Sequence, residues 1–388
     1  MDQVEQWIWL AQATGAGSPK SGLLLDRFGS AEAVYTAGPA ELERVSGLTA
    51  HDRARLGDKS LAGAQDIVGR CLTLGCRVMT RGDAEYPPAL HEIYAPPCVL
   101  YVMGRLPGPD TLALAMVGTR RPTAYGVEAA TRLAVGLAVQ GAVVVSGLAY
   151  GIDTAAHKGA IKGGGQTVAV IGCGVDYNYP AGNRELHRLI ASHGAVVSEY
   201  PPGTRPFTSN FPIRNRIIAG LSRGTVVVEA GGRSGALITA GMAAESGRDV
   251  FAVPGSIFSP MSEGTNRLLR DGAKLCCGVA DILEEYPSFV TQSLEDTPAE
   301  SGPGPMAEPP QAPAQQALLP EPAPKRRQPA GLSPVQAAVY GRLTAEPTHV
   351  DRIALEANLE PRLVLSALTV LEVQGFARSL PGRRFTAV

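Results

Sequence analysis

The sequence lacks the features of a membrane-spanning or exported protein. None of its apolar runs approaches the ~20 residues that a transmembrane helix needs. Its first residues, MDQVEQWIWLAQ, include neither the basic segment nor the small-residue cleavage site of a signal peptide. We therefore expect a cytoplasmic protein with no membrane contact.

Metal-ligand patterns and an excess of one charge are also lacking. The six cysteines form no CxxC pair, and no histidine follows at the spacing of a zinc site, so we expect no metal ion. The formal net charge is −1. This balance argues against a nonspecific polycation, so that any surface for nucleic acid must be local.

Two nucleotide-binding fingerprints are absent from the sequence. There is no GxxxxGK[ST] loop and no GxGxxG, and the segment Gly172-Cys173-Gly174 has no third glycine. These absences argue against a P-loop ATPase and a dinucleotide-dependent oxidoreductase. We expect no cofactor.

The middle of the chain alternates short apolar runs with helical stretches. Runs such as TVAVIG and GTVVVEA are apolar throughout, which is typical of strands covered on both faces of a parallel sheet. The pattern predicts a doubly wound, Rossmann-like α/β domain over 71–285. Its candidate strands are 76–80, 98–102, 112–117, 142–146, 167–171, 195–199, 225–229 and 249–253.

The flanking regions predict three further parts, consistent with the two or three domains that 388 residues suggest. Residues 1–70 have helical periodicity, and the stretch 28–48 resembles a helix-hairpin-helix or SAM-type element, with a glycine turn at Gly47. A proline-rich disordered linker is expected over 286–330. Residues 331–388 predict three helices and a hairpin, the order of a winged helix.

Four loops follow predicted strands at the edge where such sheets bind ligands. Glycine permits close approach, arginine grips phosphate, and aromatic rings stack on bases. We therefore predict a binding site from these loops and the helices after them. Its residues are Gly118, Thr119, Arg120, Ser146, Gly147, Lys158, Arg205, Phe207, Phe211, Arg214, Asn215, Arg216, Gly232, Ser234 and Gly235.

Three polar residues near these loops are candidates for catalytic groups. Asp153 stands where an N-cap is expected, so we interpret it as a cap. His157, at i+4, is interpreted as a helix-face or ligand-contact residue, and Glu229 as a partner of Arg233. The chain is therefore expected not to be an enzyme.

Arginine combined with phenylalanine favours single-stranded nucleic acid as the ligand. Basic groups follow the phosphates, and each base stacked on a ring contributes ~1–3 kcal/mol. Core packing is the competing interpretation for Phe207 and Phe211. The polar TSN before Phe211 and the proline after it favour exposure of at least one ring.

A series of motifs resembles the DNA processing protein A family (DprA, also called Smf). In chain order they are GDAEYPPAL, VGTR, SGLAYGIDTAAH, PIRNRIIAGLS, SGALITA, GRDVFAVPG and GTNRLLRDGA, spread over roughly 80–285. The resemblance implies an extended Rossmann domain that binds single-stranded DNA, forms a homodimer and helps to load the recombinase RecA during natural transformation.

Carried over to this sequence, the family's DNA pocket would include Arg120, the Ser146-Gly147 turn and the segment 211–216. One departure is that Ala181-Gly182 replaces basic residues that some members have after the YP of their LDxxYP motif. Affinity would then depend more on Arg120 and on the other site arginines.

Two rival functions remain open at this point. One is a phosphoribohydrolase of the LOG type, whose PGGxGTxxE loop the segment 229–235 resembles only faintly, because no glutamate follows the glycines before Glu245. The other is a duplex-binding winged-helix regulator. The third helix of the C-terminal region is nearly neutral, and only Arg383 and Arg384 favour DNA, so protein contact by this region is an equal alternative.

Overall fold

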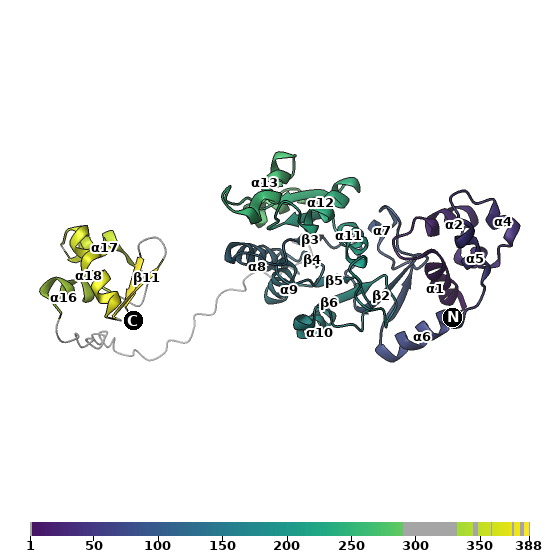
Figure 1. Ribbon diagram of the computed structural model, residues 1–388, viewed down its shortest axis with the longest axis horizontal. Helices are drawn as coiled ribbons and strands as arrows, with labels where there is room; N and C mark the ends of the chain where they lie inside the picture. Colours follow the sequence, from purple (N-terminus) through teal and green to yellow (C-terminus); the bar gives the residue numbers. More distant parts are fainter. Residues whose placement is uncertain are drawn as a thin grey trace, which may run out of the picture. The chain divides into compact units, whose positions relative to one another are not determined.

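A computed structural model describes residues 2–289, 332–343, 348–357, 359–374, 376–380 and 384–387. The chain divides into two compact units, Met1–Gly302 and Pro303–Val388, which are treated separately below (Figure 1). Within the described ranges, no helix combines the length and the hydropathy needed to cross a bilayer.

A nine-stranded sheet forms the centre of the larger unit, in the order β1-β2-β6-β5-β4-β3-β7-β8-β9. Figure 1 labels β2 to β6 of this sheet. Strands β3 to β9 run parallel, whereas β1 pairs antiparallel with β2, and β2 antiparallel with β6. The strands are β1 (Arg77–Thr80), β2 (Val99–Gly104), β3 (Ala113–Val117), β4 (Val143–Ser146), β5 (Thr167–Ile171), β6 (Gly194–Ser198), β7 (Gly224–Val227), β8 (Asp249–Ala252) and β9 (Lys274–Leu275). The doubly wound prediction and its eight strands are confirmed; only the two-residue β9 was not predicted.

Helices cover both faces of this sheet, and strand β3 shows why. Its five residues are all buried; Leu114 and Met116 belong to the core beneath α8 and α9, whereas Ala113 and Ala115 belong to the core beneath α11 and α12. The helices of this α/β part are α7 (Pro88–His91), α8 (Ala124–Val139), α9 (Ile152–Lys162), α10 (Arg184–His193), α11 (Asn210–Gly220), α12 (Gly235–Glu245), α13 (Glu263–Arg270) and α14 (Val279–Leu283). Because every side chain of β3 meets a helix, the strand has no polar alternation.

Six helices precede the sheet, as predicted for the N-terminal region. They are α1 (Asp2–Thr14), α2 (Lys20–Phe28), α3 (Ala31–Thr36), α4 (Pro39–Glu43), α5 (Ala50–Gly57) and α6 (Ala62–Leu74). Their buried residues share one core with Tyr101 of β2 and Ile190 of α10, so these helices pack directly on the α/β part. Gly47 has a φ of 89°, as a tight turn requires; whether this turn meets a phosphate stays a prediction.

The smaller unit has the three helices and the hairpin predicted for a winged helix, together with a two-residue strand, β10, that was not predicted. Its elements are α16 (Pro334–Tyr340), β10 (Thr348–His349), α17 (Val350–Ala357), α18 (Pro361–Val373), β11 (Ala377–Leu380) and β12 (Arg384–Ala387), with the sheet order β10-β12-β11. Val339, Ile353, Leu368 and Phe385 lie in its core.

The linker predicted over 286–330 lies mostly outside the described residues, as does Arg383. At its start, Tyr286 packs against the core beneath α8 and donates a hydrogen bond to Asp249 Oδ2 at 2.9 Å. The packed chain therefore continues past the predicted boundary at 285.

Candidate nucleic-acid interface

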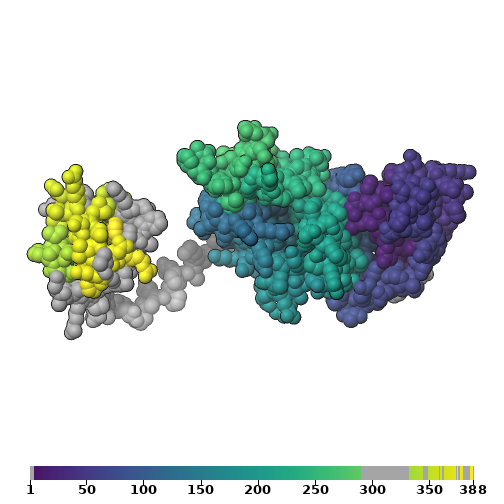
Figure 2. Space-filling view, viewed as in Figure 1, coloured from purple at the N-terminus to yellow at the C-terminus, as the bar shows by residue number. Residues whose placement is uncertain are grey.

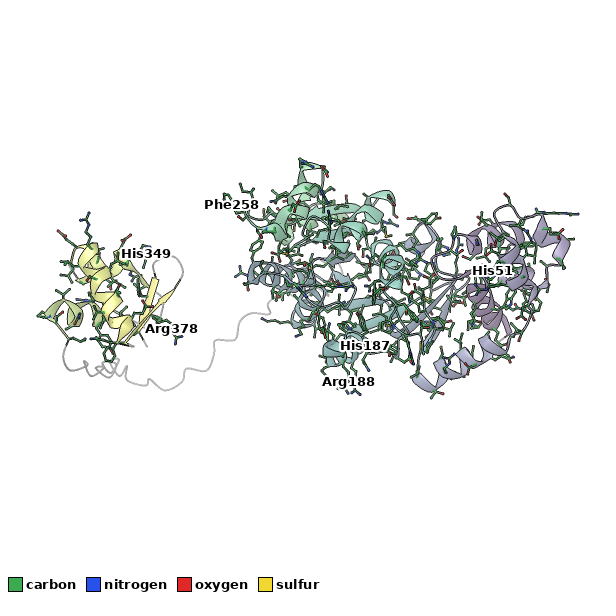
Figure 3. All side chains as sticks on the ribbon, viewed as in Figure 1. His51, His187, Arg188, Phe258, His349 and Arg378 are labelled. Atoms are coloured by element: carbon green, nitrogen blue, oxygen red, sulfur yellow. The ribbon has the colours of Figure 1, made fainter. Side chains whose placement is uncertain are left out.

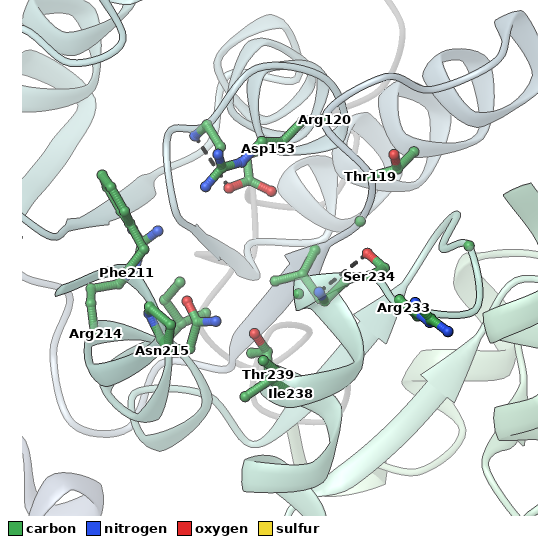
Figure 4. A pocket seen from close by; sticks show the side chains of 18 of the residues that line it. Thr119, Arg120, Asp153, Phe211, Arg214, Asn215, Arg233, Ser234, Ile238 and Thr239 are labelled. Carbon is green, nitrogen blue, oxygen red and sulfur yellow. Dashed lines mark hydrogen bonds between the residues drawn. The ribbon is translucent and has the colours of Figure 1, made fainter. Parts of the chain in front are cut away.

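A cavity of about 520 Å³ opens at the carboxyl edge of the sheet, between the loops that follow β3 and β7 (Figure 4). Strand β3 has β4 on one side and β7 on the other, so the strand order reverses here. Such a reversal point is where open α/β sheets bind ligands. Of the predicted site residues, the cavity is lined by Gly118, Thr119, Arg120, Phe211, Arg214, Asn215, Gly232, Ser234 and Gly235.

One wall of the cavity is suited to an anion. Helix α12 begins there, and its N-cap Ser234 accepts a hydrogen bond from Ala236 N at 3.3 Å. The first N–H groups of a helix and its dipole favour negative charge. The guanidinium groups of Arg120 and Arg233, both exposed, add positive charge on two sides of the opening (Figure 4).

The opposite wall contains a stacked aromatic pair. The rings of Phe211 and Tyr179 lie 5.4 Å apart between centroids, at an interplanar angle of 27°. The Arg120 guanidinium lies over the Phe211 ring, 5.6 Å from its centroid. Tyr179 is 38% exposed, and Phe207, in the loop before α11, is 58% exposed. Exposure of at least one of the two phenylalanines is confirmed.

Sequence reasoning missed Tyr179 and also Tyr150, whose hydroxyl accepts a hydrogen bond from Gly182 N at 3.2 Å. Both tyrosines line a smaller recess of about 50 Å³ that shares Phe211 and Arg120 with the main cavity. The available signals were the tyrosines in the loops that follow two parallel strands, in DYNYP after 167–171 for Tyr179 and in SGLAYG after 142–146 for Tyr150.

Arg214 lies beneath the cavity floor, where it fixes the loop after β4. It is 4% exposed, and its Nη1 donates to the carbonyl oxygens of Gly147, at 2.9 Å, and Val170. Asp153, also buried, accepts from Gly147 N at 3.1 Å and from Ala149 N at 3.2 Å. A Cβ at position 147 would lie 2.7 Å from both Arg214 Nη2 and Asp153 Oδ2, so this position requires glycine.

Burial shifts the pKa values of this pair in opposite directions. It lowers the pKa of the Arg214 guanidinium to about 10, an effect that nearby Asp153 opposes. It raises the pKa of the Asp153 carboxyl, which Arg214 opposes. Burial penalises each charge, and the opposite charge offsets part of that cost. Arg214 is thus mainly a structural group of the site.

Six predicted site residues do not line the main cavity: Gly147 and Phe207, described above, and four others. Arg216 is buried and pairs with Glu199, its Nη2 lying 2.7 and 2.8 Å from the two carboxylate oxygens. Ser146 is buried and donates to Met116 O at 2.6 Å. Lys158 of α9 and Arg205, in the loop after β6, are exposed but do not line the cavity.

Of the three interpretations of polar residues, those of Asp153 and Glu229 are wrong, and for His157 the helix-face alternative remains. Helix α9 begins at Ile152 with Gly151 as its N-cap, so Asp153 caps the preceding loop and not its own helix. His157 is fully buried and hydrogen-bonds to Thr167 Oγ1 at 2.7 Å, which excludes a ligand contact.

The third concerns Glu229, which was expected to hold Arg233. Its carboxylate instead accepts from Thr123 N at 2.8 Å and from Thr123 Oγ1 at 2.7 Å, at the N-cap of α8. Glu229 therefore ties the β7 loop to the β3 loop beneath the cavity.

Comparison with known proteins identifies the family. Residues 77–287 match the family described as DNA recombination-mediator protein A, and residues 322–383 match the DprA winged helix domain. A putative DNA processing protein DprA of Mycobacterium tuberculosis is 40% identical over 87% of this chain and 82% of its own length.

Solved structures show the same likeness. DNA processing protein A of Streptococcus pneumoniae is 36% identical with a TM-score of 0.64, covering 72% of this chain and 97% of that one. The Helicobacter pylori protein, described for its own single-stranded DNA binding mode, is 32% identical with a TM-score of 0.49, covering 57% of this chain and 97% of that one. The family match over 77–287 and the Mycobacterium tuberculosis relative show that the chain belongs to the DNA recombination-mediator protein A family, whose members are named DprA or Smf.

Proposed function

We propose that this chain binds single-stranded DNA in the cavity between the β3 and β7 loops and acts as a non-enzymatic recombination mediator that helps to load RecA. The observation that carries the proposal is the combination of the Tyr179–Phe211 stack with the exposed guanidinium groups of Arg120 and Arg233. Rings accept bases, and arginines and the α12 N-terminus accept phosphates.

A single strand fits this arrangement better than a duplex. The aromatic rings stand in the wall of a cavity of about 520 Å³, so a base reaches them only when it has left a base-paired stack. Stacking on aromatic faces is tolerant of sequence, because every base has a π-face. The proposal therefore predicts weak sequence preference and strong salt dependence.

The chemistry of the cavity does not favour the rival hydrolase. A phosphoribohydrolase needs a carboxylate that faces its substrate. Among the described residues that line the cavity, the one acidic side chain is Asp153, whose Oδ2 is engaged by Gly147 N and Ala149 N. Glu229 is buried against Thr123.

Homodimerisation and RecA contact are part of the same proposal and are supported by the family membership. A dimer would present two such cavities to one DNA strand, which raises the effective concentration for the second contact. The C-terminal unit is proposed to make an auxiliary contact with protein or duplex DNA; the exposed face of α18 carries Arg362 and Glu372, which does not favour duplex reading.

The test compares a fluorescent oligo-dT with a matched duplex over a range of salt concentrations. We expect oligo-dT to bind more tightly than the duplex. Arg120→Ala should lower the affinity for oligo-dT and should lower the salt slope, that is, the dependence of log affinity on log salt concentration, by about 0.7, the value of one single-strand phosphate contact. Arg132→Ala is the matched control, because Arg132 is an exposed arginine on α8 outside the cavity. Preference for duplex, or unchanged binding by Arg120→Ala, would refute the proposal, and release of adenine from AMP would support the hydrolase.

A further inference from the structure

Two large apolar side chains project from the loop after β8. Ile257 is 85% exposed and Phe258 is 90% exposed. Figure 3 shows Phe258 at the margin of the larger unit, pointing away from the ribbon, and Figure 2 shows the green segment to which it belongs as a projecting edge. Adjacent exposed apolar side chains on a protein surface indicate a contact site more often than single ones do.

Hydrogen bonds hold this loop in a defined shape. At its base, Gly255 N donates to Asn266 Oδ1 at 3.2 Å, and Asn266 Nδ2 donates to Gly255 O at 3.0 Å. At its tip, Phe258 N donates to Ser256 Oγ at 3.2 Å, and Ser259 N donates to Ser256 O at 3.0 Å. The two apolar side chains are therefore presented by an ordered turn.

The groove beside the tip is lined by more basic than acidic side chains. A groove of about 550 Å³ is lined by Ile257 and Phe258 together with Arg267 and Arg270 of α13, with Glu263 as its one acidic residue among the described ones. Among the described residues, Arg270 forms an ion pair with its neighbour Asp271, at 3.3 Å, and this pair is well exposed. Exposed pairs of this kind are weak, so Arg270 remains available to an anion.

The same loop adjoins the proposed DNA cavity. Strands β7 and β8 pair in parallel, with Val227 opposite Ala252, so their following loops are neighbours at one edge of the sheet. Met261 lines the cavity, and a Cβ on Gly231 would lie 3.4 Å from Met261 Cε. A single DNA strand that leaves the cavity on the side of β8 therefore reaches the groove beside Phe258.

We propose that Phe258 and Ile257, flanked by Arg267 and Arg270, form a second single-stranded DNA contact, which a strand meets after it leaves the cavity. This inference rests on the proposed function, because it extends the path of the same ligand. A ring beside an arginine is also found at the half-buried Phe211 and the exposed Arg120, and this combination suits a base followed by phosphates.

The test uses the full chain with oligo-dT of about four and about twenty nucleotides, a short strand for one contact and a longer strand for both. We expect Phe258→Ala to lower the affinity for the long oligonucleotide by roughly 5- to 150-fold, the range that one base–aromatic stack supplies. The affinity for the short oligonucleotide should not change. Phe258→Trp should restore the long-strand affinity. Leu72→Ala is the control, because Leu72 is a 78% exposed apolar side chain on α6.

Two results would overturn the inference. One is an unchanged long-strand affinity in Phe258→Ala. The other is a change of oligomeric state in Phe258→Ala with equal loss for both oligonucleotides, which would make the tip a protein contact. A failure of the proposed function can be distinguished from a failure of this inference, because Arg120→Ala tests DNA binding in the cavity with the short oligonucleotide alone.

Discussion

Replacing His157 by asparagine should remove much of the acid sensitivity of the larger unit. Thr167 Oγ1 donates its single proton to Val144 O at 2.7 Å, so His157 Nδ1 must be the donor to that hydroxyl oxygen. His157 Nε2 is buried and has no hydrogen-bond partner among the described residues. Protonation of His157 Nε2 would therefore bury an N–H group that has no hydrogen-bond acceptor among the described residues.

The magnitude follows from the pKa of this imidazole. Burial, helped by nearby Arg214, lowers the pKa of His157 from its ordinary value of 6.5 to about 3. Below pH 6.5 the unfolded chain takes up a proton that the folded chain does not, so the free energy of unfolding falls as the pH falls, until about pH 3. At about 1.36 kcal/mol for each pH unit, His157 costs roughly 2 kcal/mol of stability between pH 6.5 and pH 5.

Urea denaturation at several pH values, followed by tryptophan fluorescence, measures this difference. The chain has two tryptophans, Trp7 and Trp9, and both lie in the unit Met1–Gly302, so the signal reports that unit alone. Asparagine keeps an N–H donor near the position of Nδ1 but does not titrate. We expect a lower stability of His157→Asn at pH 7 and a shallower fall toward pH 5. Parallel curves for the two proteins would refute the argument.

Three other substitutions test the site and its support. Gly118→Ala should destabilise the protein by about 1–3 kcal/mol in urea denaturation, because its Cβ would lie 2.5 Å from Ile152 Cγ1. Tyr179→Ala should cost about 1–3 kcal/mol of oligo-dT binding, with Tyr179→Phe close to wild type; equal losses would show that the ring does not act by stacking. Glu199→Ala should destabilise the fold by about 3–5 kcal/mol, because it leaves Arg216 buried without its partner. The salt slope of oligo-dT binding should stay unchanged in Glu199→Ala, and a lower slope would place Arg216 on the DNA.

The strands of the sheet could be predicted because a strand that is buried on both faces has an uninterrupted run of apolar residues in its sequence. Each residue of β5 and β6 is buried, so these segments are uninterrupted runs of apolar and small residues. Strand β9 leaves no such trace, because it has two residues, of which Leu275 is 54% exposed. The order of the strands follows from pairing between distant segments, which a local pattern does not encode.

The start of α9 shows how tertiary contacts override a local signal. Asp153 is the residue type that caps helices, and sequence alone favours that role. Gly151 takes the cap position with a φ of 84°, and a Cβ there would lie 2.4 Å from Thr119 O. The close approach of the β3 loop thus fixes where the helix begins, and the Asp153 carboxylate is left to bind the loop before it.

The arginines of the site divide by the element that carries them. Arg214 and Arg216 lie on α11, a helix packed on the sheet, where their guanidinium groups are buried and engaged by Gly147 O and Glu199. Arg120 and Arg233 lie on loops beyond the strand ends, and both stay exposed at the cavity. A buried guanidinium that is already satisfied gains little from a phosphate, whereas an exposed one gains a charge-assisted bond. Under the proposed function, we therefore expect the helix arginines to hold the cavity in shape and the loop arginines to supply its affinity for DNA.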